Sequence, residues 1–160
     1  MGKEIERKFI CKKEVIEKLL YDNLEVQKDT IYQQYLCVGN EEVRIRKKES
    51  NGTEHYFFTI KKGKGVVREE FETEITKKTY QQLLGDKKPI IKNRMRLACN
   101  QKEVLIDIYQ DFEFVIAEVE FMSEEQAEKY TPEFWMEKDI TLDHNYKNQS
   151  LWLQLNEFHN

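Results

Sequence analysis

Charged and apolar side chains alternate with a period of two along several separate stretches of this sequence. Near the start of the chain, Glu4, Glu6 and Lys8 share one face of an extended segment, and Ile5, Arg7 and Phe9 share the other. A single strand of this kind is common at a protein surface. Its repetition along the chain constrains the fold, because every such strand has one apolar face and one ionic face.

The alternation predicts an α+β domain of antiparallel hairpins. We expect eight strands, over residues 2–10, 29–38, 42–48, 55–62, 67–76, 90–97, 103–109 and 112–121. Four amphipathic helices are expected over residues 12–21, 77–84, 123–130 and 148–158. Asn51-Gly52 is a strong hairpin signal because both residues tolerate a positive φ angle. The 160 residues suit one domain, and we assign residues 1–160 to it.

Composition limits the possible partners. Charged residues make up 35% of the chain, yet the net charge is only −4, which argues against a simple cationic nucleic-acid binder. The three cysteines are odd in number and far apart, so neither a zinc site nor a disulfide framework is expected. No signal peptide and no membrane-length apolar run is seen, and the expected location is the cytoplasm, away from membranes.

The helices need apolar surface to cover, and only the apolar faces of the strands offer enough of it. The ionic faces are then left to solvent or turned toward one another. Their acids are Glu4, Glu6, Glu70, Glu72, Asp107, Glu118 and Glu120, and their bases are Lys8, Arg44, Arg46, Lys61, Arg68, Lys92, Arg94 and Arg96.

Such an interior would have to hold ligands, because each unpaired buried ion costs several kcal/mol. Clustered carboxylates favour a divalent cation with oxygen ligands. Rows of arginine favour bidentate recognition of phosphate. Acids for a metal together with arginines for phosphate are typical of metal-assisted phosphoryl chemistry.

An ordered set of motifs resembles the CYTH domain, the family of triphosphate tunnel metalloenzymes, over essentially the whole chain. The ExExK signature is Glu4-Ile5-Glu6-Arg7-Lys8. The later motifs are Gln34-Tyr35, Arg44-Ile45-Arg46, Thr59-Ile60-Lys61, Arg68-Glu69-Glu70-Phe71-Glu72, Lys92-Asn93-Arg94-Met95-Arg96, Asp107, Glu118-Val119-Glu120-Phe121, and Tyr146-Lys147-Asn148 with Leu151.

The resemblance implies a closed eight-stranded antiparallel barrel with a hydrophilic tunnel and with helices packed on the outside. It implies a triphosphate bound together with Mg²⁺ or Mn²⁺. The main metal ligands would be Glu4, Glu6 and Glu120, and Glu70, Glu72, Asp107 and Glu118 would hold a second metal or position a water. The phosphate ligands would be Lys8, Arg44, Arg46, Lys61, Lys92, Arg94 and Arg96. The catalytic group would comprise Glu4, Glu6, Lys8, Lys61 and Glu72, with Arg68 inside the tunnel or at its rim.

Several activities share these motifs. Hydrolysis of inorganic tripolyphosphate is favoured, because a short chain suits a small-molecule substrate better than RNA ends. The alternatives are a class IV adenylyl cyclase, a thiamine triphosphatase, and a non-catalytic module that binds polyphosphate or nucleotide. The sequence does not indicate an oligomeric state.

Overall fold

The computed structural model describes residues 2–23 and 26–157. Its strands are β1 (Gly2–Cys11), β2 (Lys28–Cys37), β3 (Glu41–Ser50), β4 (Thr53–Lys62), β5 (Val67–Glu74), β6 (Ile90–Cys99), β7 (Lys102–Tyr109), β8 (Val115–Glu120) and β9 (Met136–Asp139). Its helices are α1 (Lys13–Asp22), α2 (Lys77–Leu83), α3 (Glu124–Lys129), the 3-10 helix η1 (His144–Tyr146) and α4 (Asn148–Glu157). The eight predicted strands are thus present, with ends shifted by a few residues.

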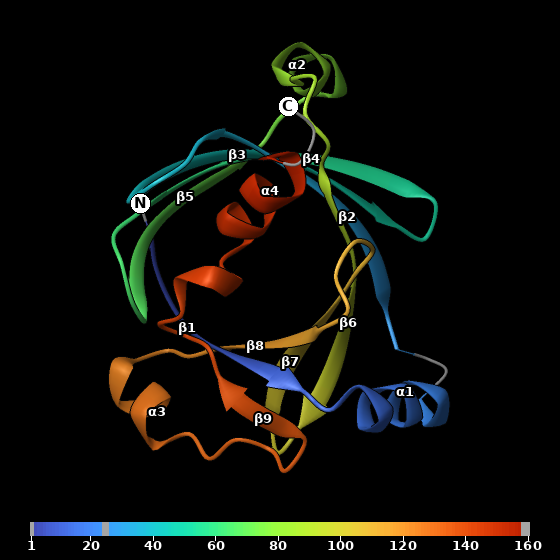
Figure 1. Cartoon of the computed structure of the whole chain (residues 1–160), viewed down its shortest axis with the longest axis vertical. Helices are drawn as coiled ribbons and strands as arrows, with labels where there is room; N and C mark the ends of the chain where they lie inside the picture. The colour runs from blue at the N-terminus through green and yellow to red at the C-terminus, as the bar shows by residue number, and fades with distance from the viewer. Residues whose placement is uncertain (1, 24–25, 158–160) are drawn as a thin grey trace.

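Strands β1 to β8 close into an antiparallel barrel (Figure 1), which confirms the predicted architecture. The order around the barrel is β1–β8–β7–β6–β2–β3–β4–β5, and pairing of Gly2–Ile5 with Val67–Glu70 closes the ring. Strand β1 then leaves β5, and its end pairs with the short strand β9 on the same edge. Closure gives each of these eight strands a paired neighbour on both sides, and it turns one face of every strand inward.

The tight turns follow from residues that accept a positive φ angle. Asn51 and Gly52 have φ angles of 49° and 78° and join β3 to β4, as their sequence predicts. Asn100 and Gln101 have φ angles of 48° and 65° and join β6 to β7. These short connections hold neighbouring strands in a fixed register, so the alternation of each strand keeps its ions on one side.

The apolar outer wall is covered in two places. Helices α1 and α3 pack on one side of the barrel, where Ile16, Ala127 and Phe9 are buried in a common core. Helix α2 covers a smaller patch, where Tyr80 packs against Tyr56 with ring centroids 5.0 Å apart. The two groups of helices lie on opposite sides of the barrel (Figure 1).

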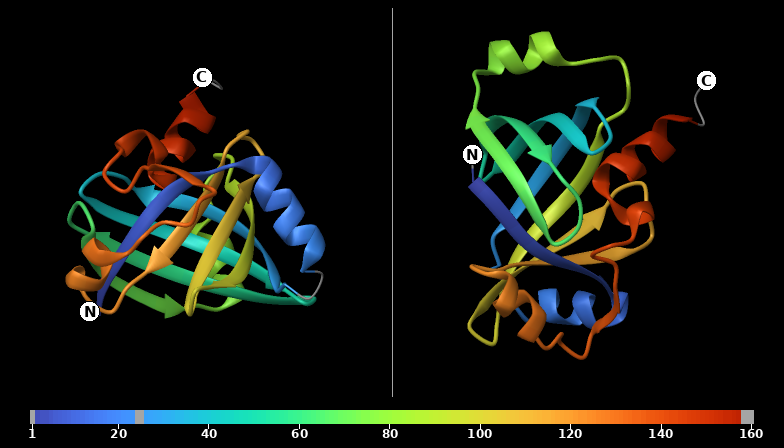
Figure 2. Two further views of the ribbon diagram at one scale, coloured as in Figure 1. Left: turned by 90° about the horizontal axis from the view of Figure 1, so that it is seen from below. Right: turned by 90° about the vertical axis from the view of Figure 1, so that its left-hand side faces the viewer.

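Helix α4 differs from the other helices, because it lies across one end of the barrel instead of along its outer wall (Figures 1 and 2). Leu151 and Trp152 of this helix pack on Tyr35, Tyr109 and Ile116, which point inward from three strands. The predicted helix over residues 148–158 is present to Glu157, and residue 158 lies outside the described residues. Within residues 2–23 and 26–157, no helix has both the length and the apolar character that crossing a membrane requires.

Candidate active site

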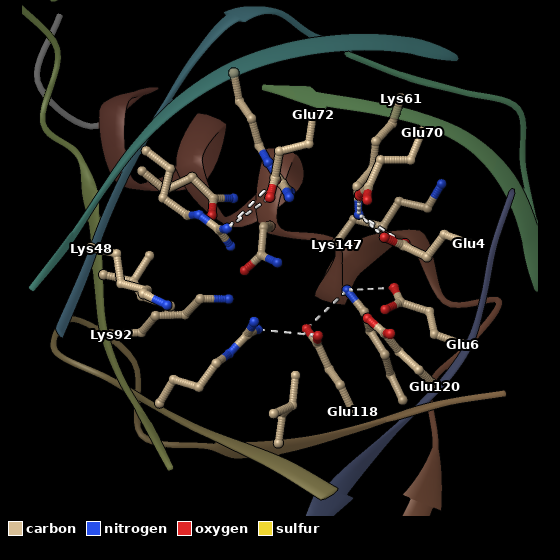
Figure 3. A pocket seen from close by; sticks show the side chains of 18 of the residues that line it. Glu4, Glu6, Lys48, Lys61, Glu70, Glu72, Lys92, Glu118, Glu120 and Lys147 are labelled. Carbon is tan, nitrogen blue, oxygen red and sulfur yellow. Dashed lines mark hydrogen bonds and ion pairs between the residues drawn. The ribbon is translucent and has the colours of Figure 1, made fainter. Parts of the chain in front are cut away.

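The inward faces of the strands enclose a cavity of about 380 Å³ (Figure 3). Its volume lies in the range of small-molecule sites, but its lining is mostly ionic where such sites are usually apolar. The predicted site residues that line it are Glu4, Glu6, Lys8, Arg44, Arg46, Lys61, Glu70, Glu72, Lys92, Arg94, Arg96, Glu118 and Glu120. Arg68 lines it as well, whereas Asp107 is fully buried in the wall beside it.

Three carboxylates gather on one side of the cavity. Glu6 of β1 lies directly opposite Glu120 of β8, and Glu4 is one inward position before Glu6. One ligand oxygen from each residue lies within 4.8 Å of the others. Because this spacing brings three oxygen donors to one point, the trio fits a small divalent cation.

Burial raises the pKa of all three carboxyl groups. At Glu120 the neighbouring charges of Glu4 and Glu6 raise the pKa further, and at Glu4 the charge of Lys61 offsets part of the rise. The trio therefore carries mutual repulsion that a bound cation would relieve. The short distances between their oxygens make the trio the candidate metal site of the cavity.

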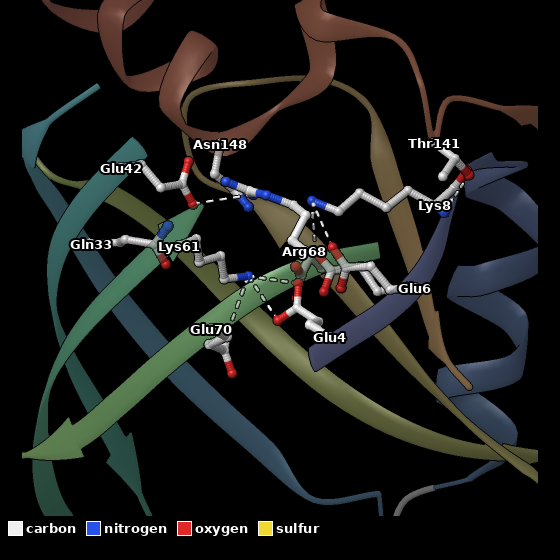
Figure 4. A network of polar contacts seen from close by, with 12 residues as sticks. Glu4, Glu6, Lys8, Gln33, Glu42, Lys61, Arg68, Glu70, Thr141 and Asn148 are labelled. Carbon is white, nitrogen blue, oxygen red and sulfur yellow. Dashed lines mark hydrogen bonds and ion pairs between the residues drawn. The ribbon is translucent and has the colours of Figure 1, made fainter. Parts of the chain in front are cut away.

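Two lysines connect the trio to the rest of the cavity (Figure 4). The Nζ atom of Lys61 lies 2.8 Å from both carboxylate oxygens of Glu4 and 3.3 Å from Glu70. The Nζ atom of Lys8 lies 3.5 Å from Glu118 and 3.7 Å from Glu6. Both ammonium groups are thus held between carboxylates, where they can neutralise an anion bound beside the trio.

A compact ionic network continues from β8 across β7 to β6. The Arg94 guanidinium donates two hydrogen bonds to Asp107, of 2.7 and 2.8 Å, and a third of 3.1 Å to Glu118. Lys92 donates to Asp107 at 2.8 Å. Although burial acts to raise the pKa values of Asp107 and Glu118, the surrounding cations, led by Arg94 at Asp107 and by Lys8 at Glu118, hold both below their usual range.

Burial has the opposite effect on cations. It lowers the pKa of Lys92 to about 8, because the charge of Asp107 only partly compensates for the loss of water and Arg94 adds repulsion. Burial and the neighbouring charge of Arg44 lower the pKa of Arg46 to about 10. In both side chains burial is the largest cause of the lowered pKa, and a neighbouring arginine adds to it.

Three arginines still have unsatisfied hydrogen-bonding groups. Among residues 2–23 and 26–157, the structure gives no hydrogen-bond partner to buried nitrogens of Arg44, Arg46 and Arg68. The contacts that these side chains do make are long, with Arg46 lying 3.3 Å from Glu72 and Arg68 lying 3.4 Å from Glu42. An unpaired donor of this kind is costly in a protein interior, and an oxyanion in the cavity would satisfy it.

Sequence reasoning missed several of the residues that line the cavity, namely Asp29, Gln33, Glu42, Lys48, Glu103, Lys147 and Asn148. Glu42 and Lys48 continue the inward alternation of β3 that Arg44 and Arg46 define, so strand periodicity could have found them. Lys147 links η1 to α4 and Asn148 is the first residue of α4, so neither lies in a strand, and only the motif Tyr146-Lys147-Asn148 pointed to that segment.

The arrangement can bind an extended anion and a cation side by side. Oxygen donors stand on the β1–β8 side, and guanidinium and ammonium groups face them from β3, β4 and β6. A polyphosphate chain with a divalent cation satisfies both sets, because its oxygens accept from the arginines and also ligate the metal. Bound in this way, the phosphorus atoms would lie in a field that stabilises the negative charge of phosphoryl transfer.

Comparisons with known proteins agree with this chemistry. No protein-family model matches the sequence. An inorganic triphosphatase of Nitrosomonas europaea is 27% identical to this chain over 157 residues, which are 95% of this chain and 98% of the relative.

Solved structures share the barrel. The crystal structure of the inorganic triphosphatase NE1496 matches with a TM-score of 0.62 at 26% identity and covers 96% of each chain. A candidate adenylate cyclase of Bacillus halodurans matches with a TM-score of 0.56 at 20% identity, over 80% of this chain and 86% of the other. At that identity the second likeness concerns the fold and not the activity.

Proposed function

We propose that this chain is a member of the CYTH family of triphosphate tunnel metalloenzymes and a divalent-metal-dependent triphosphatase that acts on inorganic tripolyphosphate. The observation that carries the proposal is the two-sided cavity. Three carboxylates within 4.8 Å of one another face arginines whose nitrogens lack partners. A ligand that carries both a metal and a phosphate chain satisfies both sides at once.

In this proposal Glu4, Glu6 and Glu120 hold Mg²⁺ or Mn²⁺, since hard oxygen donors suit these ions. The bound ion supplies a positive charge that neutralises the phosphate oxygens as the reaction proceeds. Lys61 is hydrogen-bonded to Glu4 and so keeps this carboxylate oriented toward the cavity. The raised pKa values of the trio predict that protons compete with the metal, and metal affinity should therefore fall as the pH decreases.

The phosphate chain would lie along Lys8, Arg44, Arg46, Lys61, Lys92, Arg94 and Arg96. The tight pairing of Asp107 and Glu118 with Arg94 leads us to propose that these two acids position the cations of the wall. They would thus not hold a second metal, the role that the family resemblance assigns them. Asp107 accepts three hydrogen bonds from Lys92 and Arg94, and Glu118 is shared between Arg94 and Lys8, so both have little capacity left for a cation.

Hydrolysis requires a water to attack the terminal phosphorus as the bridging P–O bond breaks, which releases orthophosphate and pyrophosphate. We assign the orientation of this water to Glu72, with Glu70 beside it. Glu72 accepts a hydrogen bond of 2.9 Å from Thr59 and lies 3.3 Å from Arg46, so its carboxylate is held in place at the cavity surface. It can take the proton that the water loses.

Inorganic tripolyphosphate suits the lining better than a nucleotide does. Among the described residues that line the cavity, Tyr35 is the only aromatic side chain, and its ring is packed against Trp152 at the covered end. Little surface thus remains on which a purine could stack. A nucleoside or thiamine group would have to extend beyond the ionic part of the tunnel.

The test is a substrate panel of tripolyphosphate, ATP, thiamine triphosphate and pyrophosphate, with Mg²⁺ and with Mn²⁺. We expect orthophosphate release to be fastest from tripolyphosphate. Glu4→Ala and Lys8→Ala should each lower this rate by roughly 10²–10³, whereas Glu113→Gln on the outer surface should not change it. Cyclic AMP from ATP would identify a cyclase, and tight binding without turnover would identify a binding module.

A further inference from the structure

Helix α4 covers one end of the cavity, and the layer of side chains beneath this helix is apolar. Below helix α4, the inward-facing side chains Tyr35, Tyr109 and Ile116 pack with Leu151 and Trp152 and fill the barrel. An anion cannot pass this layer without losing its hydration and its counter-charges. A phosphate chain that enters the cavity must therefore end before it reaches α4.

A buried carboxylate stands at this point. Glu42 on β3 lines the cavity, and only 3% of its surface is exposed. One of its oxygens, Oε1, lies 3.4 Å from Arg68 and 3.9 Å from Arg44. Figure 4 shows Glu42 and Arg68 near Asn148, below the start of α4, while Glu4 lies farther from this helix.

The contacts of Glu42 are looser than those of Asp107, another buried acid of the barrel. Asp107 is held at 2.7 and 2.8 Å by Arg94, whereas both cations near Glu42 keep buried nitrogens without partners. Glu42 thus leaves its arginines free to bind a further anion. Glu42 also adds a fixed negative charge at the covered end of the cavity.

We propose that Glu42 is a specificity-determining residue that ends the phosphate track and disfavours linear polyphosphates that extend one phosphate further toward α4. This inference rests on the proposed triphosphatase function. A terminal phosphate that binds Arg44 and Arg68 abuts the Glu42 carboxylate, and an additional phosphate would place like charges together in a water-poor site. The covered end thereby fixes which phosphate lies beside the carboxylate trio.

The experiment compares kcat/KM for tripolyphosphate and tetrapolyphosphate in the wild type, Glu42→Ala and Glu42→Gln. The wild type should prefer tripolyphosphate. Glu42→Ala, which removes both the charge and the bulk, should raise the ratio of tetrapolyphosphate to tripolyphosphate kcat/KM about tenfold or more. Glu42→Gln, which removes the charge alone, should raise it by a smaller factor.

Glu103→Gln is the matched control. Glu103 lines the same cavity but pairs with Arg96 at 2.8 Å and is mostly exposed, so its loss should leave the ratio unchanged. An unchanged ratio in both Glu42 variants would overturn the proposal, because a residue that only positions arginines would weaken both substrates equally. A rise of the ratio in Glu103→Gln to match Glu42→Ala would also overturn it.

A binding measurement separates this proposal from the proposed function. The rise in melting temperature on adding each polyphosphate with Mg²⁺ should favour tripolyphosphate in the wild type and should shift toward tetrapolyphosphate in Glu42→Ala. If the wild-type protein binds tripolyphosphate but releases no orthophosphate, the proposed triphosphatase function is refuted. The binding comparison between wild type and Glu42→Ala then tests the role of Glu42 by itself.

Discussion

At the scale of single residues, the cavity contains carboxylates in three different states. Asp107 is fully buried and tightly paired with Arg94 and Lys92, while the trio that includes Glu4 has raised pKa values. Glu42 lies between these extremes, buried but only loosely paired. The burial and partners of each acid therefore match the role that we propose for it, which is positioning a cation for Asp107, holding a metal for the trio and limiting the substrate for Glu42.

Replacing Asp107 should destabilise the protein, because Lys92 and Arg94 would lose their common partner inside the wall. Removing one partner of a buried ion pair costs about 3–5 kcal/mol, so Asp107→Asn should lower the free energy of unfolding by an amount in this range. Glu103→Gln breaks an exposed pair, for which a loss of about 0–1 kcal/mol is expected. Urea unfolding of the two variants checks the difference, and equal losses would contradict the assignment.

The pKa of Lys92, lowered by burial to about 8, predicts a limb in the pH dependence of activity. Below this pH the ammonium group is charged and attracts the phosphate chain. As the pH rises through about 8 the free enzyme loses this charge, so kcat/KM for tripolyphosphate should decrease. Lys92→Met should be slower and should lack this limb. A limb of the same size and midpoint in Lys92→Met would assign it to another group.

At the scale of elements, the strands place ions inside and the helices close the surfaces that remain. The alternation of β1 brings Glu4, Glu6 and Lys8 to the cavity, and the register of β8 brings Glu120 opposite Glu6. Helix α4 contributes in another way, since its apolar side chains fill one end of the barrel. The length and shape of the cavity thus depend on this helix as well as on the sheet.

Truncating Trp152 should open the covered end of the barrel. Its ring packs against Tyr35 with centroids 5.7 Å apart, and Trp152→Ala should cost about 3–5 kcal/mol of stability. The KM for tripolyphosphate should rise, because the start of α4 loses its anchor. Leu153→Ala, on the more exposed face of the same helix, should change both quantities little. Unchanged KM in a destabilised Trp152→Ala protein would show that α4 does not shape the site.

The sequence predicted the strands and their inward ions because a period of two fixes which face a side chain occupies. It could not predict which inward ions meet, since that depends on how far each strand is staggered in the closed barrel. Asp107 shows the difference, because its face was correct but its pairing with Lys92 and Arg94 emerged only in the fold. Lys147 escaped prediction for another reason, as a loop residue has no periodicity.

At the scale of the whole molecule, the barrel encloses more ionic surface than its own pairs can satisfy. In the described part of the chain, buried nitrogens of Arg44, Arg46 and Arg68 lack hydrogen-bond partners. The carboxylate trio has raised pKa values. Both features mark charged groups that the ion pairs of the barrel leave unsatisfied. A metal-bound polyphosphate would relieve both, so ligand binding and fold stability are expected to be coupled.

This coupling predicts a large increase in thermal stability on ligand binding. At a ligand concentration of 100 times Kd the native state should gain about 2.7 kcal/mol, and the melting temperature should rise by several degrees. Tripolyphosphate and Mg²⁺ together should raise the melting temperature more than either alone. The metal ion neutralises carboxylates that repel the phosphate chain, and the phosphate chain neutralises arginines that repel the metal ion. Calorimetry of the four combinations checks this, and strictly additive shifts would argue against a shared site.

The most direct test of the central claim is orthophosphate release from tripolyphosphate by the purified protein during a titration with Mg²⁺ or Mn²⁺. The two-sided cavity predicts that release requires the divalent ion, stops on addition of a chelator and resumes when the ion is restored. Release that continues unchanged in excess chelator, or no release with either ion, would contradict the assignment of this cavity as a metal-dependent triphosphatase site.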